Sequence, residues 1–427
     1  LPYFDFHPLP TTDGDFYSHH DPNPDVHSLA YLYTHLVPDL HSHVDPNTDA
    51  DSVLYFHSYA NFHSYPNFHI YSHINPMSEI LPFLKELLSL PGLSGHEAPV
   101  AEHIERTWRD LADEVKRTPL GSVHAVRFGN APSPRPRALL AAHMDAIGLM
   151  VTQIVDGFLR VTGIGGIDAR ILPGQPVTVY GREPLPGVVV MPTPRLLPPD
   201  LSDGVVPMDH LWVDVGLPAD EVNQKVQVGD LVAFGSLPTE LSGETIAGHS
   251  LDNRASVAAL TVCLQALRGR TLQWDAVFAA TVQEEETMAG ALTSAFVEKP
   301  ALAIAIDVTF AKGPGANDWQ TFPLGKGITL AWGPNIHPAL HRRLKEVAER
   351  AEIPYSVEYT PRHSGTDAYA MQIVAEGIPT AVVSIPLRYM HTPVEVVSLK
   401  DIQRAGRLLA EFLCALDASF TEQLTWA

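Results

Sequence analysis

The clearest pattern in the chain is an apolar run that passes into three consecutive glutamates. The segment 276–282 reads AVFAATV, and Gln283 separates it from Glu284, Glu285 and Glu286. A continuous apolar run predicts a strand that is covered on both faces. Buried carboxylates are costly unless they are paired or bound to metal, so we expect a functional site at the carboxyl end of this strand. Neighbouring residues of an extended segment point in opposite directions, so Glu284 and Glu285 would have different tasks. A strand that ends in a solvated acidic turn is the alternative.

Three other apolar runs also end in side chains that bind metals. The runs and their polar residues are 138–143 with His143 and Asp145, 301–308 with Asp307, and 380–386 with His391 a few residues later. A carboxylate two residues after His143 could orient its imidazole ring. The carboxyl ends of parallel strands lie at one edge of a sheet, so we expect these side chains to converge.

Apolar residues at helical spacing predict helices around these strands. The predicted helices are 80–88, 100–115, 255–267 and 401–416. Ser94 precedes Glu97 by three residues, which is the spacing of a capping box. Asp252 comes just before the third helix, where a carboxylate either caps the helix or bridges cations.

The middle of the chain, residues 148–246, has a different pattern. Short β-rich runs alternate with Gly and Pro, and no long helical pattern appears. This pattern predicts a small barrel or sandwich inserted into the first domain. We therefore expect an α/β fold with a mixed sheet flanked by helices. The catalytic domain would comprise residues 77–147 and 248–427, and the inserted β domain residues 148–247.

The first 76 residues have a biased composition. They contain no Lys, Arg or Glu, but they hold 9 Asp and 11 of the 21 His residues of the chain. We expect a low-complexity, disordered leader. It either captures metal weakly through its histidines or is not needed, in which case Met77 would be the true start.

Charge and cysteine content narrow the class of protein. A net charge of −21 argues against nucleic acid or an anionic membrane as a partner. Neither of the two cysteines implies a disulfide framework, and no apolar stretch is long enough to span a membrane. These features favour a cytoplasmic protein.

The polar residues at the strand ends suit a site with two metal ions. Two histidines and three carboxylates are too few for two separate ions, but they suffice if one carboxylate bridges them. One further carboxylate then remains as a general base, and the paired cations would activate a water to attack a carbonyl group. Zn is the first choice of metal, with Co and Mn as alternatives. The residues concerned are His143, Asp252, Glu284, Glu285, Asp307 and His391.

Two other functions fit parts of this pattern. A glycoside hydrolase would use two carboxylates and need no histidine ligands. A metal-buffering or scaffold protein would use the histidine-rich leader and an inactive core.

From Met77 onward the chain resembles the tetrahedral, dodecamer-forming metalloaminopeptidase family, which includes glutamyl and leucyl aminopeptidases and proteins labelled endoglucanase. The matching motifs are AHMDAIG (142–148), GGIDARILPGQPV (165–177), HSLDNR (249–254), TVQEEE (281–286), AIDVT (305–309), SGTDA (364–368) and IPLRYMHTPVE (385–395).

The resemblance implies a role for each residue of the site. His143 and Asp307 would bind one metal ion, and Glu285 and His391 would bind the other. Asp252 would bridge the two ions. Glu284 would be the general base, and Asp145 would hold His143. It also implies a zinc-peptidase-like catalytic domain that removes N-terminal residues from peptides. The inserted β domain would mediate subunit contacts in a homo-oligomer, dimer-based and up to a dodecamer.

The chain departs from the family pattern at one position beside the bridging residue. The family usually has a second Asp after the bridging Asp, whereas this chain has Asn253. Asn keeps an acceptor oxygen but has no charge, so we expect the change to affect metal affinity more than metal identity.

Overall fold

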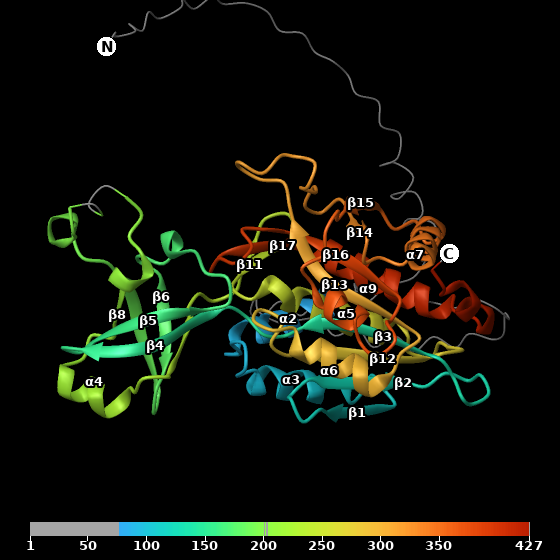
Figure 1. The fold of residues 1–427 in the computed structure, drawn as a ribbon, viewed down its shortest axis with the longest axis horizontal. Coiled ribbons are helices and arrows are strands. Elements are labelled where there is room, and N and C mark those ends of the chain that lie inside the picture. Colours follow the sequence, from blue (N-terminus) through green and yellow to red (C-terminus); the bar gives the residue numbers. More distant parts are fainter. Residues whose placement is uncertain (1–76, 200, 202–203, 427) are drawn as a thin grey trace, which may run out of the picture. The chain divides into compact units, whose positions relative to one another are not determined.

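The computed structural model describes residues 77–199, 201 and 204–426 (Figure 1). The predicted leader, residues 1–76, lies outside the described residues. Within the described part of the chain, no helix is both long enough and apolar enough to cross a membrane.

The centre of the fold is a set of four parallel strands in one large sheet. Their order is β12, β3, β13 and β16, with bounds Asp275–Thr281, Arg137–His143, Leu302–Phe310 and Thr380–Arg388. These strands contain the four apolar runs, and their carboxyl ends lie at the same edge of the sheet. The sequence prediction of converging strand ends is therefore confirmed.

Antiparallel strands extend this sheet on both sides. On the β12 side lie β2 (Val123–Arg127) and β1 (Glu114–Arg117), and beyond β16 lie β17 (Glu395–Ser398), β11 (Thr245–Gly248) and β10 (Thr239–Leu241). A branch is formed by β14 (Ile328–Trp332) and β15 (Tyr355–Tyr359), of which β14 also pairs with β16. The result is the mixed sheet that the sequence predicted.

Both faces of the central strands are buried, which explains their uninterrupted apolar sequences. Along β13, Leu302, Ile304 and Ile306 belong to one hydrophobic cluster, whereas Ala303 and Ala305 belong to another. The alternation follows the pleat of the strand, which turns successive side chains to opposite faces. Small alanines on the second face let the helices approach closely.

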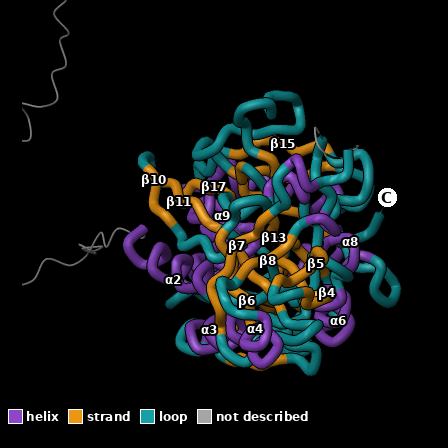
Figure 2. The backbone as a smooth tube through the Cα atoms, turned by 90° about the vertical axis from the view of Figure 1, so that its left-hand side faces the viewer, coloured by secondary structure: helices purple, strands orange, loops and turns teal. Residues whose placement is uncertain are grey.

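Two groups of helices cover these two faces. The first group is α2 (Met77–Ser89), α3 (Ala98–Trp108), α5 (Leu251–Ala266), α7 (Pro338–Arg350) and α9 (Leu399–Cys414), and the second is α6 (Ala289–Glu298) and α8 (Asp367–Gln372). Figure 2 shows the helices as purple coils around the orange strands. The four helices predicted from periodicity are present, and three of them end within a few residues of the predicted bounds. The helix predicted over 100–115 ends at Trp108, and Val115 lies in strand β1 instead.

The predicted capping box at the start of α3 was wrong. No side chain caps this helix, and Ser94 makes no side-chain hydrogen bond among the described residues. The carboxylate of Glu97 instead accepts hydrogen bonds from the backbone amides of Gly95, at 2.7 Å, and Gln283, at 3.1 Å. It thereby joins the start of α3 to the loop that follows β12.

The middle of the chain forms a closed six-stranded barrel with its own hydrophobic core (green in Figure 1). Its strands are β4 (Gly148–Val155), β5 (Phe158–Ile164), β8 (Trp212–Asp214), β7 (Pro184–Val190), β6 (Pro176–Tyr180) and β9 (Leu231–Phe234), in spatial order. A short helix, α4 (Ala219–Lys225), was not predicted, because seven residues with one buried side chain show no clear period. Strands β10 and β11, which follow the barrel, belong to the large sheet.

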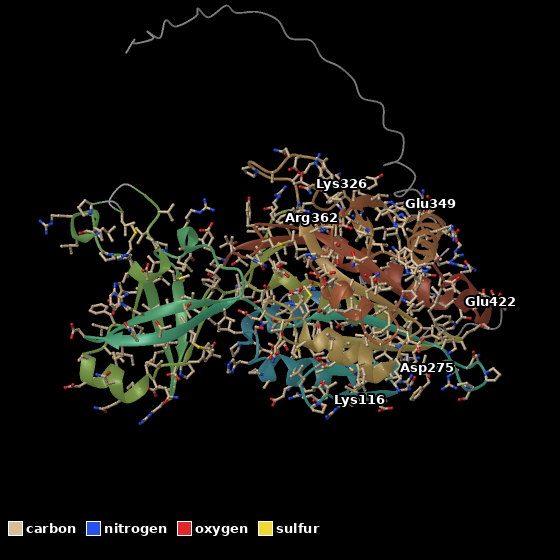
Figure 3. All side chains as sticks on the ribbon, in the orientation of Figure 1. Lys116, Asp275, Lys326, Glu349, Arg362 and Glu422 are labelled. Atoms are coloured by element: carbon tan, nitrogen blue, oxygen red, sulfur yellow. The ribbon has the colours of Figure 1, made fainter. Side chains whose placement is uncertain are left out.

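An ion cluster around the buried Glu298 joins the far end of α6 to the sheet, and Figure 3 labels its partly exposed Lys116. The carboxylate of Glu298 lies 2.8 Å from Nζ of Lys116, 2.7 Å from Nη1 of Arg137 and 2.9 Å from Nδ1 of His124. Only 1% of the Glu298 side chain is exposed. Burial alone would raise the pKa of Glu298, but the hydrogen bonds from His124 and Lys116 outweigh burial and lower the pKa to about 2.

We predict that Glu298→Gln destabilises the protein by on the order of 3 kcal/mol near pH 7. The pKa of this carboxyl is lower in the folded than in the unfolded state, so its contribution is complete above about pH 4.5 and is lost as the pH falls towards 2. The melting-temperature difference between variant and wild type should therefore shrink below pH 4.5.

The exposed pair Glu183–Lys225, with an N–O distance of 2.7 Å, provides a matched control. Glu183→Gln should change the stability by less than about 1 kcal/mol, because exposed ion pairs contribute little. Equal effects of the two substitutions would contradict the proposed stabilising role of the Glu298 cluster.

Candidate metal site

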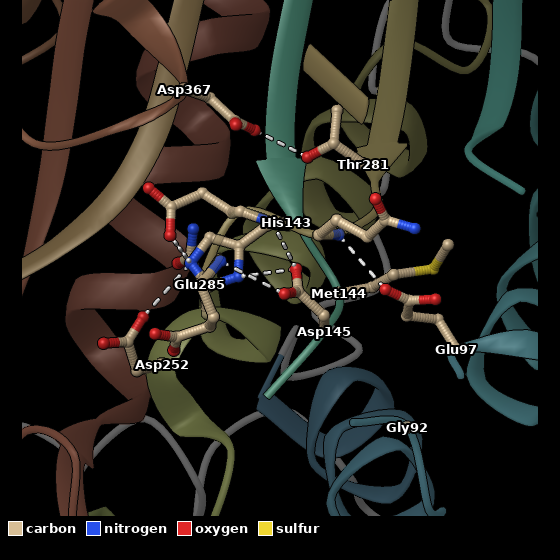
Figure 4. Close-up of polar contacts among 12 residues, drawn as sticks. Gly92, Glu97, His143, Met144, Asp145, Asp252, Thr281, Glu285 and Asp367 are labelled. Carbon is tan, nitrogen blue, oxygen red and sulfur yellow. Dashed lines mark hydrogen bonds and ion pairs between the residues drawn. The ribbon is translucent and has the colours of Figure 1, made fainter. Parts of the chain in front are cut away.

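The structure brings the predicted metal-binding residues together at the carboxyl edge of the central strands (Figure 4). Nε2 of His143 lies 3.3 Å from Oδ1 of Asp252 and 3.9 Å from Oδ1 of Asp307. Nε2 of His391 lies 3.4 Å from Oδ2 of Asp252 and 3.4 Å from Oε2 of Glu285. Each group of three offers ligand atoms within 4.8 Å of one another, and Asp252 belongs to both groups.

Asp252 reaches this position because the start of α5 is not helical. Asp252 and Asn253 have non-helical backbone angles, and Ser250 has φ 68°. The side chain of Asn253 donates a hydrogen bond from Nδ2 to the carbonyl oxygen of Ile306, at 2.9 Å. An ionised Asp at this position would have no proton to donate, so Asn253 ties the start of α5 to β13 in a way that Asp could not.

The sequence predicted that Glu284 and Glu285 lie on the extended end of a strand, but the structure places them elsewhere. Strand β12 ends at Thr281, and Glu284 and Glu285 lie in a turn. Gln283, with φ 59°, redirects the chain into this turn. As a result both carboxylates approach the site: Glu284 lies 3.8 Å from Nε2 of His143, while Glu285 lies beside His391.

Asp145 contacts more residues of the site than the sequence suggested. Its Oδ1 lies 3.3 Å from Nδ1 of His143, the contact expected from their spacing. It also accepts hydrogen bonds from the backbone amides of Glu284, at 3.0 Å, and Glu285, at 3.2 Å. This buried carboxylate therefore positions the ring at the end of β3 and the turn after β12 at the same time.

Glu395 was missed as a residue of the site. Its Oε2 accepts a hydrogen bond from the amide of Asp252, at 3.0 Å, and its Oε1 accepts one from the amide of His391, at 2.9 Å. Only 2% of Glu395 is exposed. The signal available in the sequence was its place in the motif that contains His391, but spacing alone gave no partner for it.

The loop after barrel strand β5 also contacts the site. The carbonyl oxygen of Gly166 lies 3.0 Å from Nδ1 of His391, and the amide of Gly165 donates to Glu286, at 2.6 Å. A Cβ on Gly166 would lie 2.9 Å from Nδ1 of His391, so a larger residue would displace the ring. The loop fixes the orientation of His391, a contact that no sequence pattern predicted.

The electrostatics of the site show an excess of carboxylates. Burial raises the pKa of Glu284 to about 9 and the pKa of Glu285 to about 8. Burial also raises the pKa of Asp307 well above its ordinary value. Burial alone would lower the pKa of His143, but the surrounding carboxylates, Glu284 above all, raise it well above its ordinary value.

These shifts fit a site for divalent cations. Neighbouring carboxylates keep protons because they cannot all be ionised in a buried space without positive charge. Divalent ions would supply that charge, and carboxylate oxygens with imidazole nitrogens suit Zn, Co or Mn. The donor atoms of the two residue groups therefore fit divalent cations in their chemistry.

Another buried acid lies behind the metal-binding groups. Asp367, at the start of α8, accepts a hydrogen bond of 2.6 Å from the hydroxyl of Thr281, and its Oδ1 has no hydrogen-bond partner among the described residues. Burial raises the pKa of Asp367 to about 6. Asp367 belongs to the SGTDA motif, but nothing in the sequence indicated a role for it.

The site opens into a cavity of about 670 Å³. Its lining includes the two metal-binding groups, Glu284 and Glu286, and residues from the ends of β13 and β15 and from the loop before α8. This volume is in the range of small-molecule sites.

Comparison with known proteins identifies relatives of this chain. Residues 121–408 match the family model described as M42 glutamyl aminopeptidase. A lysyl aminopeptidase from Pyrococcus furiosus is 38% identical over 336 residues, which cover 77% of this chain and 95% of that protein.

Solved structures agree with this match. A TET aminopeptidase from a marine sediment archaeon of the Thaumarchaeota has a TM-score of 0.77 and 30% identity, covering 82% of this chain and 99% of that chain. The TET1 peptidase of Pyrococcus horikoshii, described as assembling into a tetrahedron or a large octahedral shell, has a TM-score of 0.68 and 31% identity, covering 79% and 100%. A Thermotoga maritima structure described as an endoglucanase has a TM-score of 0.65 and 28% identity, covering 80% and 99%.

We predict that Glu395→Gln weakens metal binding by about 10- to 100-fold, the usual range for a group that supports ligands from behind. The amide group of Gln offers one acceptor oxygen, so one of the two backbone amides held by Glu395 would lose its acceptor. Competition with a chromogenic chelator measures the affinity, and circular dichroism checks the fold.

Glu411→Gln is a suitable control, since Glu411 pairs with Arg270 away from the site, at 2.8 Å. It should leave metal affinity unchanged. Unchanged affinity in the folded Glu395 variant would show that this carboxylate does not position the ligands.

Proposed function

The chain belongs to the M42 glutamyl aminopeptidase family, and from that premise we propose that it removes N-terminal residues from peptides at a site for two metal ions. The assignment as an aminopeptidase follows from the family. One observation supports the two-metal site above all: two groups of potential ligands share Asp252.

In this proposal each residue of the cluster has a separate role. His143 and Asp307 would hold one divalent ion, Glu285 and His391 the other, and Asp252 would contact both. When bound, the ions would lower the pKa of a water molecule and polarise the carbonyl group of the scissile bond. Zn remains the first choice of metal, with Co and Mn as alternatives.

Glu284 would be the general base. It belongs to neither ligand group, it lines the same cavity, and its carboxylate lies 3.8 Å from Nε2 of His143. It would accept a proton from the attacking water and donate it to the leaving amine. Asp145 would hold both His143 and the turn that carries Glu284 in place.

We also propose that the protein forms a homo-oligomer through its barrel. Related TET peptidases assemble into dodecamers and larger shells. Several large apolar side chains of the barrel and its loops are exposed, as expected for a contact surface. They are Val155, Phe158, Val188, Met191, Leu196 and Val205. The cytoplasmic location inferred from the sequence stays a prediction.

We predict that Glu284→Gln lowers kcat for an aminoacyl-anilide substrate by roughly 10²- to 10⁴-fold, because a neutral amide cannot accept the proton of the attacking water. Metal content, measured by elemental analysis, and melting temperature should stay close to wild type. Near-normal turnover in a folded, metal-loaded variant would exclude Glu284 as the general base.

Removal of the metal ions provides a test of the proposed chemistry. Incubation with a chelator followed by dialysis should abolish peptide hydrolysis, and addition of Zn, Co or Mn should restore it. A glycoside hydrolase that acts through two carboxylates would keep its activity in the chelator. Full peptidase activity in metal-free protein would contradict the two-metal proposal.

A further inference from the structure

The proposed chemistry assigns no role to one carboxylate in the cavity. Glu358, at the end of β15, lines the main cavity and also an adjoining hollow of about 450 Å³. It belongs to neither ligand group and is not hydrogen-bonded to a residue of those groups. Its position therefore needs a separate explanation.

The charges of the cavity lining are unbalanced even with metal bound. The lining contains six carboxylates and, among the described residues, no Lys or Arg. Two divalent ions would balance the charges of Asp252, Glu284, Glu285 and Asp307. Glu286 and Glu358 would remain as uncompensated negative charges beside the place where a substrate binds.

Glu358 is held in a fixed position. Its Oε1 accepts a hydrogen bond from the hydroxyl of Thr309, at 2.7 Å, and its Oε2 accepts one from Thr329, at 2.6 Å. Thr309 follows the ligand Asp307 by two residues on β13, so both side chains point to the same face, roughly 7 Å apart along the strand. The carboxylate of Glu358 therefore lies beyond the metal-binding groups. Its distance from them is about the length of one long side chain.

The remaining lining suits a long side chain with a charged end. Exposed rings of Phe310 and Tyr369 and the side chains of Met288 and Met390 provide apolar surface in the same cavity. Lys and Arg pack their aliphatic stems on such surface while the charged end reaches a polar partner.

Few positive groups compete for Glu358 within the described residues. Arg362 lines the adjoining hollow, but it is exposed and makes no ion pair with Glu358 in the described part of the chain. His363 lines both spaces and is exposed as well. The carboxylate is therefore available to a cation that enters with the substrate.

We propose that Glu358 makes this site selective for peptides whose first residue is lysine or arginine, an inference that rests on the proposed aminopeptidase function. The ammonium or guanidinium group pairs with the Glu358 carboxylate while the peptide bond lies at the metal-binding groups. An acidic first residue is repelled by Glu358 and Glu286, and a neutral one forgoes the ion pair.

The test compares lysyl, norleucyl and glutamyl fluorogenic amides, because norleucine has the carbon stem of lysine without the ammonium group. For the metal-loaded wild-type protein, kcat/KM should be at least about tenfold higher for lysyl than for norleucyl amide, and lowest for glutamyl amide. Raising the salt concentration should lower the lysyl value more than the norleucyl value, because salt screens the ion pair.

Glu358→Gln should lower the lysyl-to-norleucyl ratio by about tenfold. Gln can still bond to both threonine hydroxyls, so we expect the fold to be kept, and the melting temperature checks this. Glu376→Gln, which removes an exposed charge in the loop after α8, should leave the ratio unchanged. The variant Glu286→Gln shows how much the other uncompensated acid of the cavity contributes to this ratio.

A binding measurement complements the kinetics. Calorimetry with free L-lysine and L-norleucine should show that lysine binds more tightly to the wild-type protein and that Glu358→Gln removes most of this difference.

The outcomes distinguish the two proposals. No hydrolysis of any of the three amides by the metal-loaded protein would overturn the proposed function itself. Hydrolysis with a preference for norleucyl or glutamyl amide would overturn the inference alone. An unchanged ratio in Glu358→Gln, or an equal loss in Glu286→Gln, would also remove Glu358 as the specificity residue.

Discussion

The site depends on the cost of burying several carboxylates at one edge of a sheet. Four parallel strands end there, and the lining of the cavity contains six carboxylates and no Lys or Arg among the described residues. Without added positive charge, burial raises the pKa of Glu284 to about 9 and the pKa of Glu285 to about 8. Bound cations would offset this cost, and we propose that the two ligand groups that share Asp252 hold two of them.

Two further buried carboxylates keep this cluster in place through the backbone. Asp145 accepts hydrogen bonds from the amides of Glu284 and Glu285, and Glu395 accepts them from the amides of Asp252 and His391. The geometry of the ligands thus depends on residues that are not themselves expected to touch a metal ion.

The surroundings of the cluster come from elements outside the four strands. The loop after β5 orients His391 through the carbonyl group of Gly166, so the inserted barrel domain contributes to the site. On another side, β15 presents Glu358 in the cavity, where Thr309 and Thr329 hold it. The central strands supply the chemistry, while these peripheral segments shape the space that a substrate occupies.

The sequence by itself determined the fold class, the central strands and the identity of the residues that converge. It did so because a strand buried on both faces must be apolar throughout, which makes each interruption by a polar residue, such as His143 or Asp307, visible. Only the tertiary structure decided the turn that aims Glu284 and Glu285, the bonds made by Glu395 and the approach of Glu358. Apart from the bond between His391 and Glu395, the hydrogen bonds that hold these groups join residues 29 to 143 positions apart. Local periodicity records only neighbours within a few residues.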